Sequence, residues 1–93
     1  MKTYVIERTV PGAGQMDAAA LGAIAAQSNT VLRALGPEIQ WVHSYVSDDK
    51  ITCVYRASGL DIIEEHARCG GFPADEVLEV RAVIDPTTAL DTD

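Results

Sequence analysis

Apolar residues recur at intervals of three and four along two segments of the chain, which is the spacing of an amphipathic helix. The first segment begins near Met16 and stops at Gly36-Pro37, because glycine caps a helix and proline prevents its continuation. The second covers residues 58–69 and stops at a pair of glycines. The pattern therefore predicts two helices, of which the first is the longer.

Four other segments are alternating or rich in β-branched and aromatic residues, as strands are. They cover residues 3–9, 39–46, 51–57 and 76–84. The order β-α-β-β-α-β is typical of an α+β ferredoxin-like fold, in which a four-stranded antiparallel sheet carries both helices on one face, as in dimeric α+β barrels. We expect a single domain over residues 1–86 and an acidic, unstructured tail over 87–93.

The central hairpin, IQWVHSYVSDDKITCVYRA, has two faces that both look suited to burial. A tight turn centred on Asp48-Asp49 places side chains alternately on the two sides of the sheet. The side predicted to face the helices carries Val42, Ser44, Val46, Ile51, Cys53 and Tyr55. The other side carries Trp41, His43, Tyr45, Thr52, Val54 and Arg56. This register pairs Ser44 with Cys53, Val46 with Ile51 and Val42 with Tyr55.

The last predicted strand also has two faces, and its apolar residues indicate which of them faces the helices. Leu78, Val80, Ala82 and Ile84 are all apolar and are predicted to face the helices. Val77, Glu79, Arg81 and Val83 are then predicted to face away. The uncovered face, which we call the open face, is too apolar for a monomer. We therefore expect a homodimer in which two open faces stack about 10 Å apart.

The amino-acid composition limits the kinds of partner and the cellular compartment that we expect for this protein. The chain has 93 residues, 47% of them hydrophobic, and a formal net charge of −7, which repels nucleic acids. No apolar run approaches the roughly 20 residues that span a membrane. Glu7 and Arg8 interrupt the stretch where a signal peptide has its apolar core. Two cysteines do not make a disulfide framework, so we expect free thiols and a cytoplasmic protein without membrane or nucleic-acid partners.

Recognisable catalytic motifs are missing from the sequence, which favours a non-catalytic protein without an organic cofactor. On the open face, Trp41, His43 and Tyr45 are candidates for binding a flat ligand or for anchoring the dimer. On the helix side, Cys53 and Tyr55 point towards the second helix, which carries His66. Histidine, cysteine and tyrosine can all bind a transition metal, although a packed histidine and a buried thiol are equally open.

Glu7 is unusual because it lies in the middle of a predicted strand. A carboxylate at such a position needs a partner. A salt bridge to Arg81 on the adjacent strand would provide one, and a bound metal would be the alternative. The candidate metal ligands are therefore His66, Cys53, Glu7 and Tyr55.

Several segments resemble a known family: QWVHSYV, the strand around Cys53, EHA followed by GFPA, and VIDPTTA. The family is small and bacterial, is catalogued mostly as a domain of unknown function, and is often labelled nickel-binding. The likeness extends from about Tyr4 to Ala89. It implies a ferredoxin-like fold, a homodimer and a bound divalent metal, nickel in the characterised branch. His66 and Cys53 match positions of that branch.

Three functions remain open from the sequence. The first is a small non-catalytic homodimer that binds nickel or another divalent transition metal. The second is a dimeric α+β barrel enzyme or small-ligand binder in which His43 or His66 acts as an acid or base. The third is an interaction module that has neither metal nor substrate.

Overall fold

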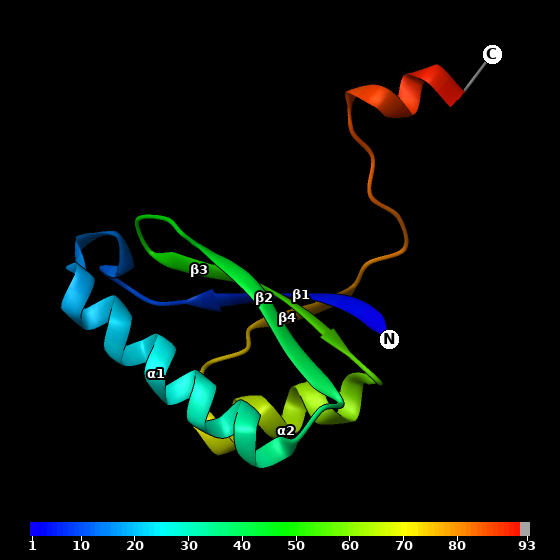
Figure 1. Cartoon of the computed structure of the whole chain (residues 1–93). Helices are drawn as coiled ribbons and strands as arrows, with labels where there is room; N and C mark the ends of the chain where they lie inside the picture. The colour runs from blue at the N-terminus through cyan, green and yellow to red at the C-terminus, as the bar shows by residue number, and fades with distance from the viewer. Residues whose placement is uncertain (92–93) are drawn as a thin grey trace.

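The computed structural model describes residues 1–91 and contains four strands and two long helices (Figure 1). Their order along the chain is β1 (Lys2–Thr9), η1 (Ala13–Gln15), α1 (Ala18–Leu35), β2 (Ile39–Val46), β3 (Lys50–Ala57), α2 (Leu60–Gly70), β4 (Glu76–Glu79) and η2 (Pro86–Asp91), where η marks a 3₁₀ helix. This order confirms the predicted α+β ferredoxin-like fold.

The ends of the two helices have local causes. The side chain of Asp17 accepts a hydrogen bond from the amide of Ala20, 2.9 Å away, and so caps the start of α1. At the end of α2, Gly71 adopts a left-handed conformation with φ 67°, and its amide donates back into the last turn. Neither helix within residues 1–91 is long and apolar enough to cross a membrane.

The sheet has the strand order β2-β3-β1-β4, and each neighbouring pair is antiparallel. Both helices lie against one face of it, and the opposite face is uncovered in this chain (Figure 1). The buried core lies between the sheet and the helices, where Tyr4 and Ile6 of β1 meet Ile63 of α2. Alternation along β1 therefore sends Tyr4, Ile6 and Arg8 inward and Glu7 to the open face.

The hairpin register is confirmed at its turn and differs beyond it. Ser44 lies opposite Cys53 and Val46 opposite Ile51, as predicted. A β-bulge between Trp41 and His43 then adds one residue to β2, so Trp41 instead of Val42 lies opposite Tyr55. The prediction that Trp41 belongs to the open face is therefore wrong, because the bulge returns its ring to the helix side.

The last strand is shorter than predicted and has the opposite orientation. β4 ends at Glu79, and its register places Val77 opposite Ile6 and Leu78 opposite Val5. Since Ile6 faces the core, Val77 also faces the core, whereas Leu78 is 48% exposed on the open face. The predicted faces of this strand are inverted.

Residues after Glu79 leave the sheet as an arm that reaches away from the domain (Figure 1). Val83, Ile84 and Leu90 on this arm are more than 70% exposed. The arm ends in η2, which overlaps the tail that we expected to be unstructured. Residues 92 and 93 of that predicted tail lie outside the described residues.

Candidate functional site

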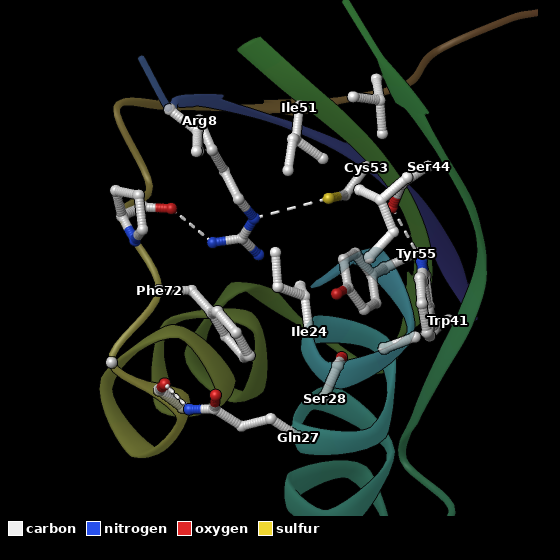
Figure 2. Close-up of a pocket in the computed structure, with 17 residues that line it drawn as sticks. Arg8, Ile24, Gln27, Ser28, Trp41, Ser44, Ile51, Cys53, Tyr55 and Phe72 are labelled. Carbon is white, nitrogen blue, oxygen red and sulfur yellow. Dashed lines mark hydrogen bonds between the residues drawn. The ribbon is translucent and has the colours of Figure 1, made fainter. Parts of the chain in front are cut away.

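A pocket of about 400 Å³ lies between the inner face of the sheet, α1 and the loop after α2 (Figure 2). Most of its wall is apolar, and α1, β2, β3 and the loop after α2 all contribute to it. The side chains of Leu21, Ile24, Val46, Ile51, Trp41 and Phe72 form much of this wall. A cavity of this size and character is typical of sites for small organic ligands.

Arg8 is the charged residue in the pocket wall, and it is only 4% exposed. Its Nε donates to the sulfur of Cys53 at 3.4 Å, and its Nη1 donates to the carbonyl of Pro73. The guanidinium also lies 5.5 Å from the centre of the Phe72 ring. Its Nη2 is buried and has no hydrogen-bond partner within the described chain. A buried donor without a partner is costly, so this nitrogen distinguishes Arg8 from the other polar groups of the wall.

His66 lies behind the pocket and is fully buried. Its Nε2 is 3.2 Å from the hydroxyl oxygen of Ser28, and its ring stacks on Phe72 with the centres 5.4 Å apart. Burial, with a contribution from nearby Arg8, lowers the pKa of His66 from 6.5 to about 4. The imidazole is therefore neutral near pH 7, and its full burial agrees with the packed histidine that the sequence left open.

Tyr55 and Cys53 project from β3 towards the same interior (Figure 2). Burial raises the pKa of the Tyr55 phenol, while Ser28 and Arg8 oppose that effect. The phenol therefore stays protonated at neutral pH and can donate a hydrogen bond. Both cysteines are free thiols, as the sequence predicts, and Cys53 is buried whereas Cys69 is exposed.

The four candidate metal ligands do not come together in one chain. His66, Cys53 and Tyr55 lie on the inner side of the sheet, whereas Glu7 belongs to the open face. The expected ion pair between Glu7 and Arg81 is replaced by one between Arg81 and Glu79. Within residues 1–91, no three histidine, cysteine or carboxylate groups converge on a point that could hold a metal. The cation of Arg8 against Cys53 further disfavours a metal at the inner position.

The open face carries the remaining candidates in two cross-strand rows. One row contains His43, Val54, Val5 and Leu78, and the next contains Tyr45, Thr52, Glu7 and Glu76. His43 and Tyr45 are exposed, and their rings meet edge to face at 4.9 Å. Imidazole and carboxylate groups therefore share an accessible surface with exposed apolar side chains.

Trp41 instead lines the pocket, where its indole nitrogen donates to the Ser44 hydroxyl at 2.9 Å (Figure 2). Neither His43 nor His66 lines this pocket. An acid or base role for a histidine inside the pocket therefore has no geometric support.

Sequence reasoning missed Arg8 and Ser28 as site residues. The signal for Arg8 was present, because it follows Tyr4 and Ile6 at alternate positions of one strand. For Ser28 the signal was its place on the apolar stripe of the first helix, which brings it against His66.

The fold and the pocket define a ferredoxin-like α+β domain with a partly polar cavity beneath its sheet. More specifically, the chain belongs to the family described as "Nickel responsive protein SCO4226-like", whose sequence profile matches residues 4–80. The crystal structure of SCO4226 from Streptomyces coelicolor A3(2) is similar to this chain, with a TM-score of 0.74 and 13% sequence identity. The alignment covers 88% of this chain and 99% of that one. No curated protein matches the sequence. The resemblance inferred from the sequence segments is thereby confirmed.

Proposed function

We propose that this protein is a small non-catalytic homodimer that binds nickel or another divalent transition metal at its open sheet face. Its membership of a nickel responsive family supports a nickel-related role. The proposed location of the metal rests on the exposed imidazole of His43, which lies on the same face of the sheet as the carboxylates of Glu7 and Glu76. Imidazole and carboxylate are suitable ligands for such a metal.

The dimer proposal rests on the apolar content of the same face. Val54 and Val5 lie side by side at its centre, and Leu78 and Tyr45 are 48% and 63% exposed at its edges. Stacking two copies would remove these side chains from water, and face-to-face pairing of sheets is a common geometry. Closed two-fold dimers are also the commonest oligomers.

Dimerisation would also complete the metal site. One chain offers fewer than three converging donors among residues 1–91, so further ligands must come from water or a second copy. A two-fold axis parallel to the strands would place β2 of one copy over β4 of the other, because these are the two edges of the sheet. His43 would then lie over Leu78 of the facing copy, one cross-strand row away from that copy's Glu76.

Nickel titration by calorimetry of chelator-stripped protein tests this proposal. We expect saturable binding, with a loss of at least about tenfold in affinity for His43→Ala and none for His66→Gln. The second variant is the matched control, since it removes the other histidine from the opposite side of the sheet. Absence of saturable binding, or loss of binding only in His66→Gln, would overturn the open-face site.

A further inference from the structure

The cation of Arg8 faces the pocket without a matching anion. The ion pairs among residues 1–91 join Lys2, Arg68 and Arg81 to glutamates, and none includes Arg8. The pocket wall contains no aspartate or glutamate. Asp75 is exposed, and its carboxylate accepts a hydrogen bond from the amide of Thr9. That hydrogen bond lowers the pKa of the Asp75 carboxyl, and the charge of Arg8 makes a smaller contribution in the same direction. A guanidinium keeps its charge in proteins, so the pocket presents a buried positive charge with no carboxylate in direct contact among residues 1–91.

The geometry around Arg8 has the features of a built binding position. Two of its three nitrogens are held by Cys53 and Pro73, which fixes the plane of the guanidinium. The third, Nη2, is buried and has no hydrogen-bond partner in the part of the chain that the structure describes. Figure 2 shows the guanidinium and the Tyr55 ring projecting from neighbouring strands into the space bounded by Ile24 and Phe72. The donor without a partner therefore belongs to a side chain of the cavity wall.

From this arrangement we propose that the pocket binds an organic monocarboxylate with an apolar body. The carboxylate accepts a hydrogen bond from Nη2 of Arg8 and supplies the missing negative charge. The apolar body lies against Leu21, Ile24 and Val46. This site is on the inner side of the sheet and is independent of the metal proposed for the open face.

The number of hydrogen-bond donors in the pocket favours a ligand with one negative charge over a ligand with two. Among the described residues, Nη2 is the one nitrogen of Arg8 without a hydrogen-bond partner, and the neutral hydroxyl and amide groups of the wall belong to Tyr55, Ser28, Ser44 and Gln27. Phosphate carries about two charges at neutral pH and three acceptor oxygens, which this site leaves largely unmatched. A carboxylate needs one cation and a few donors, and a largely apolar wall suits the remainder of such a ligand.

Trp41 provides a direct reporter of occupancy, because it is the only tryptophan and it lines the pocket. Octanoate and 3-phenylpropionate would be titrated at neutral pH against octanol and 3-phenylpropanol, which have the same bodies without the charge. EDTA in every buffer excludes any contribution from nickel. We expect each acid to shift Trp41 emission saturably and to bind at least about tenfold more tightly than its alcohol.

Two pairs of variants complete the test. In Arg8→Met, the affinities for the acid and for its alcohol should differ by no more than about threefold. Arg56→Met, which removes an exposed arginine, should still bind the acid more tightly than the alcohol. Ala25→Leu fills the pocket and should abolish both signals, while Ala26→Leu on the exposed side of α1 should not. Equal binding of acid and alcohol to the wild type, no emission change with any probe, or retention of the acid preference in Arg8→Met would overturn the proposal. If Arg8→Met did not fold, the wild-type comparison and Ala25→Leu would decide it.

Discussion

The Nε2 atom of His66 lies 3.2 Å from the hydroxyl oxygen of Ser28, a contact that joins the two helices beneath the sheet. Both residues are buried, and the other ring nitrogen of His66 has no hydrogen-bond partner among the described residues. Phe72 stacks on the imidazole ring, and the Tyr55 ring contacts it at a tilted angle. The histidine therefore acts here as a neutral, packed core residue, and protonating it requires burial of a charge.

This burial predicts a loss of stability in acid. The pKa of His66 falls from 6.5 in the unfolded chain to about 4 in the folded one, so the unfolded state binds more protons between these values. Stability is complete above about pH 6.5 and declines by up to about 3 kcal/mol as the pH falls to 4. Denaturant unfolding of wild type and His66→Gln at several pH values measures the difference. Parallel curves for the two proteins over that range would contradict the assignment.

Replacing Arg8 should reveal the cost of its unpaired charge. Methionine has a similar length and needs no counter-ion, so the ligand-free Arg8→Met protein should unfold with an unchanged free energy or one raised by about 1 kcal/mol. The lost contacts to Cys53 and Pro73 limit the gain. Urea denaturation in ligand-free buffer is the measurement. Destabilisation beyond about 2 kcal/mol would show that those contacts outweigh the burial of the charge.

Gly70 should tolerate no side chain, whereas Gly22 should accept one. A methyl group at Gly70 would overlap the ring of Phe72, which contacts both His66 and the Arg8 guanidinium. We expect Gly70→Ala to lower the free energy of unfolding by about 1–3 kcal/mol. Gly22→Ala in α1 meets no atom and should raise it by about 0.5–1 kcal/mol. Thermal unfolding of both variants checks the pair, and equal effects would contradict the packing of Phe72.

The proposed dimer interface can be broken by a single charge. Val54 lies at the centre of the open face, between His43 and Val5 in the cross-strand register. Val54→Asp should therefore convert a dimer into a folded monomer, because burying an unpaired carboxylate opposes association. Leu60→Asp places the same change on an exposed position of α2 and should leave the dimer intact. Sedimentation equilibrium distinguishes the outcomes, and a wild-type monomer or a dimeric Val54→Asp would contradict the interface.

Much of the fold follows from local pattern. The helix start near Met16 and its end at Gly36 follow from helical spacing and capping chemistry, and the turn at Asp48-Asp49 sets the register as far as His43. Beyond His43 the bulge at Val42 reverses the direction of Trp41. The alternation of apolar and polar residues along one strand does not reveal a β-bulge, because a bulge depends on how two strands pair.

The last strand shows a different limit. Its apolar residues at Leu78, Val80 and Ile84 suggested a core-facing row, but only Val77 packs against the core. Pairing with β1 fixes the orientation, and that tertiary contact overrides the apolar count. Arg8 was not identified as a site residue because charged residues are usually exposed. Its burial in the wall of a pocket follows only from the tertiary structure.

The position of the metal tests the proposed function most directly. Methyl NMR spectra would be recorded while paramagnetic nickel is added to the full chain. We expect that signals of Val5, Val54 and Leu78 on the open face broaden first, and that those of Ile6, Ile51 and Ile63 on the inner side persist. Early broadening of the inner isoleucines, or no selective broadening at all, would contradict a nickel site at the open face.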